Sequence, residues 1–149
     1  MRAVVQRALS ARVEVDGEVV GRIDRGLVVF VGAAESDERA DIDYTVNKVV
    51  NLRVFPDERG RMTRSLGDVG GSLLVISQFT VFGDVRRGLR PSFDGAMEPV
   101  RAEAMYDEFV AATRAAGARV ETGRFRADMR VFVENDGPVT ILVDSKRLF

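Results

Sequence analysis

Hydrophobic residues in the first third of the chain follow the alternating pattern of β-strands. Short valine-rich runs place apolar side chains at every second position, which is the period of a strand with one buried face. Asp16-Gly17 supplies the positive φ angles of a tight hairpin turn between two of these runs. The expected strands are residues 2–8, 11–15, 19–23 and 26–31, and the last is apolar throughout, which indicates burial on both faces.

The pattern then changes to the period of a helix. A charge-rich stretch from Glu35 to Asp43 leads into apolar residues that share one helical face, namely Ile42, Val46, Val49 and Val50. Ser36 or Asp37 is the expected N-cap. The five acidic residues of this stretch can be interpreted as a regulatory patch, but acids also favour a helix N-terminus, and we prefer that interpretation.

The second half of the chain begins with another buried strand and another helix. Residues 73–79 are the second buried strand, which is apolar from Leu73 to Ile76, and a helical pattern follows Pro99. Proline fits the first turn of a helix because its missing N–H has no partner there, and Gly117 marks the end. The residues expected on the apolar face of this helix are Met105, Phe109 and Ala112 or Ala116.

Three further strands are expected at residues 119–125, 129–134 and 139–143, with a turn between the last two. The chain shows no internal repeat, linker or low-complexity tract. We therefore predict one α/β domain of the α+β type over residues 1–149, with two main helices and a largely antiparallel sheet.

Composition restricts the chemistry that such a domain can perform. Hydrophobic residues make up 46% of the 149 residues and charged residues 30%, as in an ordinary globular domain. The chain contains no cysteine and no histidine. These absences exclude disulfides, thiolate nucleophiles, a Ser-His-Asp triad, a histidine base and a His-ligated zinc. An enzyme with this sequence must use backbone groups, hydroxyls, amides, carboxylates, arginines or the substrate itself.

Charge and hydropathy narrow the setting in which the protein acts. The 22 basic and 23 acidic residues leave a net charge of -1, which does not favour gripping long nucleic acids. Nearly all the basic residues are arginine, which fits either a codon bias or bidentate recognition of phosphates and bases. The N-terminus lacks a signal-peptide pattern, and no apolar run approaches the ~18 residues of a membrane helix. We expect a cytosolic protein without a membrane partner.

The first candidate site is Ser77-Gln78-Phe79-Thr80, where polar side chains begin abruptly at the end of the most apolar strand. Strand ends are commonly polar, so a structural role fits this observation too. Thr80 has no histidine to deprotonate it and is a poor nucleophile. Catalysis here would instead require hydroxyl and backbone N–H donors that stabilise a developing oxyanion.

The second candidate site is the segment Asn135-Asp136-Gly137-Pro138-Val139-Thr140. A turn between strands is one explanation, yet proline removes a ladder donor just where the next strand begins. A cis bond at Gly137-Pro138 would fit this turn, although few X-Pro bonds are cis and the sequence does not establish one. Such a turn would place two carbonyl oxygens side by side, suited to an ammonium group.

The third candidate site is the segment Asp84–Phe93, which contains Arg86, Arg87 and Arg90. Arginines beside an aromatic residue suit phosphates and a stacked base, and a solvated loop fits equally well. From Arg53 to Arg90 seven arginines accompany four acidic residues, which predicts one modest basic face. The loop Gly67–Gly71 lacks the Gly-Lys-Ser/Thr ending of a P-loop, which excludes nucleoside-triphosphate binding of that kind.

Together these segments resemble the D-aminoacyl-tRNA deacylase family, also called D-Tyr-tRNA deacylases, which are small homodimeric enzymes that remove D-amino acids from mischarged tRNA. The resemblance covers nearly the whole chain through residues 1–7, 51–55, 70–80, 90–93 and 135–140. The Ser-Gln-Phe-Thr and Gly-Pro-Val-Thr motifs, in this order, are highly specific together. The resemblance implies a barrel-like sheet, a homodimer, no cofactor or metal, and no DNA partner.

The resemblance also implies a role for each candidate residue. The floor around the ester and the 3′-terminal adenosine would consist of Ser77, Gln78, Phe79 and Thr80. Gly137-Pro138 would be a cis pair that enters the other subunit's active site and reads the amino group of the substrate. Arg7 would hold this pair in place, and Met129 would also contact the substrate. Arg86, Arg87 and Arg90 would contact the RNA.

One position departs from the family pattern Gly-x-Phe-Gly-Ala-x-Met. Residues 123–129 follow it except at the second glycine, where this chain has Arg126. Glycine permits tight backbone packing or close approach of RNA, so Arg126 either alters the local geometry or adds an RNA contact.

The implied reaction accounts for the missing histidine. An aminoacyl ester is already activated, so about 4 kcal/mol of transition-state stabilisation gives roughly a thousandfold acceleration, and the terminal 2′-hydroxyl of the RNA can assist. Enantiomers share every functional group, so selection requires a rigid wall that rejects the L side chain. Glycine escapes this wall, which implies hydrolysis of glycine mischarged on tRNA-Ala. Two alternatives remain, a dimeric RNA- or nucleotide-binding protein and a purely structural dimer, and neither requires both motifs.

Overall fold

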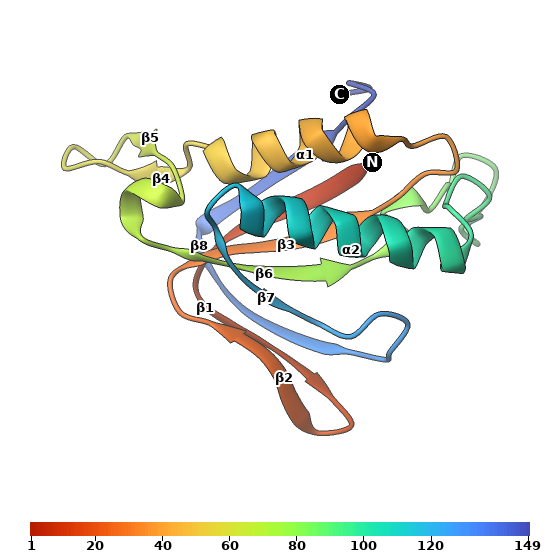
Figure 1. Cartoon of the computed structure of the whole chain (residues 1–149), viewed down its shortest axis with the longest axis horizontal. Coiled ribbons are helices and arrows are strands. Elements are labelled where there is room, and N and C mark those ends of the chain that lie inside the picture. Colours follow the sequence, from red (N-terminus) through yellow and green to blue (C-terminus); the bar gives the residue numbers. More distant parts are fainter.

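One long strand, β1 (Arg2–Val15), organises the sheet in the computed structural model, which describes residues 1–149. Along one edge β1 pairs antiparallel with β8 (Arg130–Asp144) over nearly its whole length. Along the other edge it pairs with β3 (Gly26–Gly32) in its first half and with β2 (Glu18–Ile23) in its second half. Because β1 changes partner, the sheet bends, and the β1–β2 end lies below the rest of the molecule in Figure 1.

The other two strands of this sheet pair in parallel and bring the sheet back toward β2. β6 (Ser72–Ser77) pairs with β3, and β7 (Arg119–Thr122) pairs with β6. β7 also approaches β2 so closely that a Cβ on Gly21 would lie 2.4 Å from the carbonyl oxygen of Thr122. The sheet is therefore nearly closed. The prediction of one α+β domain with a largely antiparallel, barrel-like sheet is confirmed, with the parallel pairings confined to β6.

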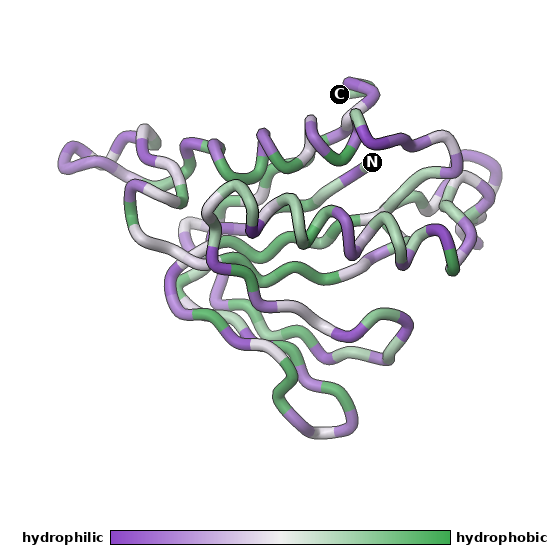
Figure 2. Tube along the Cα trace, in the orientation of Figure 1, coloured by the Kyte–Doolittle hydropathy of each residue, from purple (hydrophilic) through white to green (hydrophobic).

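Two helices cover one face of this sheet (Figure 1). They are α1 (Arg39–Asn51) and α2 (Pro99–Ala115), and their buried apolar residues belong to the core that the helices share with the strands. Figure 2 shows the hydrophobic part of α1 on the side toward the sheet. Pro99 stands in the first turn of α2, and Gly117 follows its end with φ +93°, as predicted. Neither helix has the length and apolar character that crossing a membrane requires.

The hydrophobic core has two parts, one on each side of the curved sheet. The larger part fills the space between helices and strands and contains the fully buried Phe55 and Phe109. The smaller part lies within the curve of the sheet, around Val13, Leu74 and Ile76. The cavity described below opens where these two parts meet, at the end of β6. The remaining short elements are β4 (Phe55–Pro56), β5 (Met62–Arg64) and the 3₁₀ turns η1 (Gly67–Val69) and η2 (Phe79–Phe82).

Two pairs of predicted strands are single strands in the structure. Residues 2–15 form one strand with register shifts around Ala8, and residues 130–144 form another. The prediction of a turn at residues 135–138 is therefore wrong, because these residues lie within β8 (Arg130–Asp144). Both errors have one physical cause, because each strand carries irregular positions opposite the other and the pair continues past them.

Three other boundaries differ from the prediction. The strands predicted at residues 73–79 and 119–125 are Ser72–Ser77 and Arg119–Thr122, because the chain turns at both ends beside the cavity. The N-cap of α1 is Glu38, which forms a capping box with Asp41, rather than Ser36 or Asp37. Asp37 is instead buried, where it accepts the Ala34 N–H at 2.6 Å and lies 2.6 Å from the Met1 amino group.

Candidate active site

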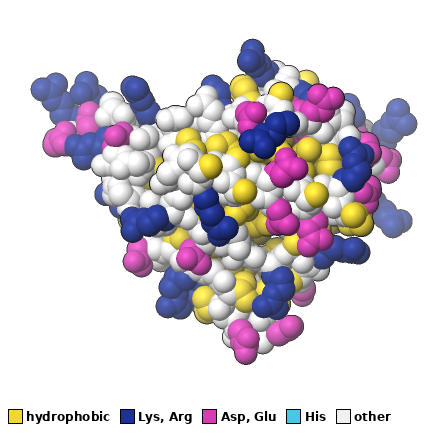
Figure 3. All heavy atoms as spheres, viewed as in Figure 1, with side chains coloured by type: hydrophobic (Ala, Val, Ile, Leu, Met, Phe, Trp, Pro, Cys, Tyr) yellow, Lys and Arg dark blue, Asp and Glu magenta, His cyan; other side chains and the backbone are white.

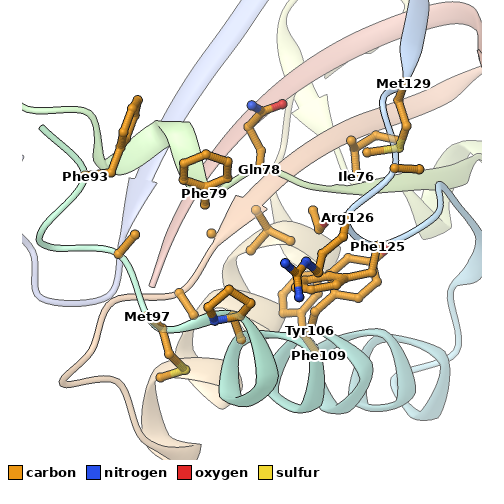
Figure 4. Close-up of a pocket in the computed structure, with 18 of the residues that line it drawn as sticks. Ile76, Gln78, Phe79, Phe93, Met97, Tyr106, Phe109, Phe125, Arg126 and Met129 are labelled. Carbon is orange, nitrogen blue, oxygen red and sulfur yellow. The ribbon is translucent and has the colours of Figure 1, made fainter. Parts of the chain in front are cut away.

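A cavity lies between the end of β6, α2 and the loop that precedes β8 (Figure 4). Its volume is about 660 Å³, and 15 of its 22 lining residues are hydrophobic. This size and character are typical of sites for small organic ligands. The aromatic residues of its wall are Phe79, Phe93, Tyr106, Phe109 and Phe125. The sequence singles out Phe79 and Phe93 as candidate contacts and Phe109 as a core residue, and it gives no role to Tyr106 and Phe125.

The floor of the cavity forms where β6 ends. Gln78 donates its backbone N–H to the Val31 carbonyl at 2.8 Å, and η2 begins at the next residue. The Phe79 ring is 57% exposed and meets Phe93 edge to face, with ring centroids 5.0 Å apart. The first N–H groups of a helical turn have no partner within the turn. The segment thus presents backbone donors and an exposed aromatic ring together.

Thr80 stands slightly apart from its neighbours in this segment. Ser77, Gln78 and Phe79 line the cavity, whereas Thr80 does not. The Thr80 hydroxyl accepts a hydrogen bond from the Gln78 side-chain amide and is exposed on the surface. The Thr80 side chain is therefore placed to orient Gln78 rather than to reach into the cavity.

The opposite wall comes from the loop between β7 and β8 and includes Met129, as Figure 4 shows. Arg126 lies in the same loop with φ +59°, and the Ala127 N–H donates to the Arg124 carbonyl at 3.3 Å. A positive φ at the third residue of such a turn is the pattern of a type II turn, which favours glycine. Arginine adopts it at a cost of roughly 1 kcal/mol. The loop thus forms a glycine-type turn with arginine at the position of positive φ.

Ionisable groups in the cavity are few and mostly committed to structure. The Tyr106 hydroxyl donates to the Val75 carbonyl at 2.9 Å, and burial raises its pKa well above the usual value, so it remains protonated. The Glu98 carboxylate accepts the Val100 and Arg101 N–H groups at 3.0 and 2.8 Å as the N-cap of α2. Only Arg126 and Asp128 remain as charged groups, and both are exposed.

The Gly137-Pro138 segment lies outside this cavity, in the middle of β8. Its peptide bond is cis, and both residues are exposed. The register places Asn135 and Thr140 opposite Ala8 and Gln6, which pair with the beginning of β3, whereas Ser77 pairs with Val31 near its end. Three to five residues of strand, or roughly 10–17 Å, separate these positions along the strands, and β1 and β3 lie between β8 and β6. One chain therefore does not bring Gly137-Pro138 to its own Ser77–Thr80 segment.

Two polar side chains, those of Arg7 and Asn135, hold the Gly137-Pro138 segment in place. The Arg7 guanidinium is buried, donates to the Val54 carbonyl, and forms an ion pair with Asp136 through Nε at 2.9 Å. The Asn135 side-chain amide donates to the carbonyls of Arg7 and Val139 at 2.9 and 3.0 Å. Both contacts fix the backbone on either side of Gly137. Sequence reasoning assigned no role to Asn135, because an amide in this segment reads as a turn residue.

The arginines expected on one basic face are divided between the two ends of the molecule. Arg53–Arg64 surround the β4–β5 end, whereas Arg86–Arg90 lie at the opposite end, as Figures 1 and 3 show. The prediction of a single basic face is wrong, because the chain crosses the whole sheet through β6 between the two groups. Residues 84–92 form a hairpin closed by two hydrogen bonds between Asp84 and Ser92. Within it Arg86 pairs with Asp84, while Arg87 and Arg90 make no ion pair.

Known proteins match this chain along its length. The model of the D-Tyr-tRNA(Tyr) deacylase family matches residues 4–144. Proteins named D-aminoacyl-tRNA deacylase from Sorangium cellulosum and Symbiobacterium thermophilum are 74% and 55% identical, each covering all of this chain and 100% and 99% of the relative. A solved structure called c-Myc DNA Unwinding Element Binding Protein has a TM-score of 0.92 at 39% identity over 97% of this chain and 98% of its own. The chain belongs to the D-Tyr-tRNA(Tyr) deacylase family.

Proposed function

We propose that the protein hydrolyses the ester bond of D-aminoacyl-tRNA in the cytoplasm and releases the free D-amino acid and tRNA. The main support for this proposal is that one cavity, in a chain of this family, is lined by Ser77, Gln78, Phe79 and Met129. The cavity holds no metal-binding cluster of His, Cys, Asp and Glu. Chemistry that depends on the substrate's activated ester suits such a site.

The 3′-terminal adenosine of the substrate would occupy the aromatic part of the cavity. Phe79 is exposed and already packs against Phe93, so its free face is available for a base. Base–aromatic stacking contributes about 1–3 kcal/mol per base in single-stranded RNA complexes. This arrangement would direct the ester bond toward the floor around Ser77 and Gln78.

Hydrolysis would proceed by attack of water on the ester carbonyl. The N–H groups at the start of η2 would donate hydrogen bonds that stabilise the negative charge developing on the carbonyl oxygen. The 2′-hydroxyl of the terminal ribose would assist proton transfer, and the Thr80 side chain would only help to position Gln78. The bond that breaks joins the carbonyl carbon to the ribose oxygen, which leaves with a proton.

The Gly137-Pro138 segment of a second copy would complete each site in a homodimer. The segment is exposed on its own chain, firmly supported by Arg7, and distant from its own cavity. In a dimer with twofold symmetry each chain would lend its segment to the other. The Gly137 and Pro138 carbonyls would then accept hydrogen bonds from the α-ammonium group of the substrate.

Chiral selection would follow from this arrangement. With the ammonium group fixed by two carbonyls, the side chain of an L-amino acid would meet backbone, whereas that of a D-amino acid would point into open space. Backbone does not move aside as a side chain can, so rejection is steric. Glycine has no side chain to reject, and glycyl-tRNA mischarged on tRNA-Ala would be a substrate as well.

The hairpin of residues 84–92 would contact the RNA outside the cavity. Its base adjoins the cavity through Phe93, and its free guanidinium groups are those of Arg87 and Arg90. Arginine side chains suit phosphates in this position. Arg86 would contribute less, because Asp84 already neutralises it.

One assay separates this function from its alternatives. The protein is incubated with D-tyrosyl-tRNA, L-tyrosyl-tRNA and glycyl-tRNA, and the released amino acid is measured. We expect release from the D-tyrosyl and glycyl esters and none from the L-tyrosyl ester. Equal or absent release would contradict the proposal. Binding of RNA or of a single-stranded DNA oligonucleotide without any hydrolysis would favour a nucleic-acid-binding protein instead.

A further inference from the structure

Arg126 occupies a backbone position that arginine rarely adopts. Its φ of +59° lies in the left-handed region, at the turn position where glycine is favoured. The turn itself is closed by the hydrogen bond from Ala127 to Arg124 and does not require an arginine side chain. Arginine therefore destabilises the turn relative to glycine, and its side chain makes no contact that stabilises the turn.

The Arg126 side chain is also free of partners within the chain. It is exposed, lines the cavity beside Phe125, and makes no hydrogen bond or ion pair (Figure 4). The two carboxylates that share the cavity do not neutralise it, because Glu98 caps α2 and Asp128 does not pair with it. Arg126 is thus the single cationic side chain on the cavity wall.

A free guanidinium on the rim of an apolar cavity suits an anion that enters with an apolar group. A guanidinium forms bidentate hydrogen bonds with phosphate oxygens. A nucleotide whose base lies in the cavity carries its phosphodiester at the rim, where Arg126 is exposed. The carboxylate of a bound amino acid ester is absent, since it is esterified, so phosphate is the anion that the substrate supplies.

We propose that Arg126 binds the phosphodiester that precedes the 3′-terminal adenosine and so adds an RNA contact at the position of a glycine in the family pattern. The inference rests on the proposed function, since it takes the 3′ end of an RNA as the ligand. It assigns Arg126 to binding and not to the chemical step.

The test compares substrates that differ only in phosphate. D-tyrosyl-tRNA, the D-tyrosyl ester of the dinucleotide CpA, and D-tyrosyl-adenosine carry many, one and no phosphodiesters. In Arg126→Gly we expect kcat/KM on the dinucleotide ester, relative to the adenosine ester, to fall roughly tenfold, as for loss of one charged hydrogen bond at an exposed site. The slope of log kcat/KM against log salt on tRNA should become shallower by about 0.7.

A matched control lies two residues away. Arg124 belongs to the same turn and is exposed, but it does not line the cavity, so Arg124→Ala should leave the substrate ratio and the salt slope unchanged. Arg126→Lys should retain part of the phosphate effect, because it keeps the charge and loses the bidentate geometry. Thermal unfolding of Arg126→Gly should occur at an equal or higher temperature, because glycine relieves the left-handed backbone.

Several results would overturn the inference. An unchanged ratio in Arg126→Gly, or an equal loss on all three esters accompanied by weaker dimerisation, would assign the side chain to another role. Titration with the unreactive trinucleotide CCA keeps the test independent of hydrolysis, and Arg126→Gly should bind it roughly tenfold more weakly. If the wild type hydrolyses none of the esters, the proposed function fails, and equal CCA affinity in both proteins would then dismiss the Arg126 contact separately.

Discussion

The cavity at the end of β6 and the Gly137-Pro138 segment of β8 differ in nearly every physical respect. The cavity is concave and mostly apolar and aromatic, and its floor presents backbone donors and the side chains of Ser77 and Gln78. The Gly137-Pro138 segment is exposed backbone, held by the buried Arg7 and the half-buried Asn135. One region can enclose a substrate but lacks rigid carbonyls directed at an ammonium group. The other offers such carbonyls but encloses nothing.

Under the proposed function these two regions are the halves of one site, and a single chain does not bring them together. The register of β1 with β3 and β8 separates the halves along the sheet. A second copy of the chain supplies the simplest way to join them, since each surface would then be used twice. The comparison also predicts that substitutions in the two halves affect turnover and the discrimination between D and L esters to different degrees.

The largest effect is expected from Gly137→Ala. A Cβ at this position would lie 2.8 Å from Val139 Cγ2 and 3.0 Å from Arg7 Nη2, and φ is +116°. We expect turnover of D-tyrosyl-tRNA to fall at least about a hundredfold, comparable with loss of an essential hydrogen-bonding group in an active site. Single-turnover hydrolysis and sedimentation would show lost activity in a folded dimer.

Gly17→Ala provides the control for backbone strain. Gly17 has φ +80° and open space around it, so the substitution carries the left-handed penalty without any clash. Its unfolding free energy should fall by roughly 1 kcal/mol while activity remains. If Gly137→Ala keeps D-specific hydrolysis and L-rejection intact, the segment is structural only.

A smaller but still large effect is expected from Arg7→Met. This change removes the ion pair with Asp136 and the bond to the Val54 carbonyl, so Gly137 loses its support. Breaking a buried pair destabilises proteins by about 3–5 kcal/mol, and partial exposure of Asp136 lowers this to roughly 2 kcal/mol. We expect turnover to fall roughly tenfold beyond any loss of folded protein, with poorer discrimination between D and L esters.

Arg12→Met is the matched control for Arg7→Met. Arg12 lies on the same strand and pairs with Glu14 at 2.8 Å, but it is far more exposed. The control should change stability by less than about 1 kcal/mol and leave the ratio of D to L hydrolysis unchanged. An equal effect of both substitutions on that ratio would show that Arg7 has no special connection to Gly137.

A modest effect is expected from Thr80→Ala in the other half of the site. The Thr80 hydroxyl does not line the cavity, and its visible role is to accept a hydrogen bond from Gln78. Hydrolysis should persist within about tenfold of wild type, in line with one lost neutral hydrogen bond. A substrate that ends in 2′-deoxyadenosine should react much more slowly. Complete loss in folded Thr80→Ala, with normal reaction of the 2′-deoxy substrate, would identify a threonine nucleophile.

The smallest effect is expected at Asp41, which lies outside both halves and should alter stability rather than activity. Burial raises the pKa of Asp41, but hydrogen bonds from Lys146, Ser145 and the Glu38 N–H outweigh it and bring the pKa to about 2. Because the folded-state pKa is below the unfolded value, the stabilisation is full above about pH 4 and is lost as pH falls toward 2. This amounts to about 1–2 kcal/mol. Unfolding titrations of wild type and Asp41→Asn should converge in this pH range, and parallel curves down to pH 2 would refute the assignment.

The sequence predicts the two halves more accurately than it predicts the separation between them. Alternating and helical patterns locate most strands and both helices, because those patterns reflect burial of one face. The segment Asn135–Pro138 reads locally as a turn, yet it continues one strand, because its partner β1 is long enough to pair on both sides of the irregular positions. Long-range pairing of this kind leaves no local mark.

The same limit applies to the residues of the site. Ser77, Gln78 and Phe79 stand out because polarity changes abruptly at a strand end, and Met129 follows from the family pattern. Tyr106 and Phe125 line the cavity beside them, but in sequence an aromatic residue at such spacing is indistinguishable from a core residue. The separation of the arginines into two groups likewise depends on the path of β6 across the sheet.

Complementation between two inactive variants tests the trans-completed site most directly. Ala102→Trp, which directs bulk from α2 into the cavity, and Gly137→Ala are each purified, confirmed to be inactive, then unfolded and refolded together in equal amounts. Half of the dimers would contain both chains, and each of these would hold one intact site, so activity should return to about a quarter of the wild-type value. No recovery in a sample shown to contain mixed dimers, or full activity in a monomeric wild type, would contradict a site shared between two chains.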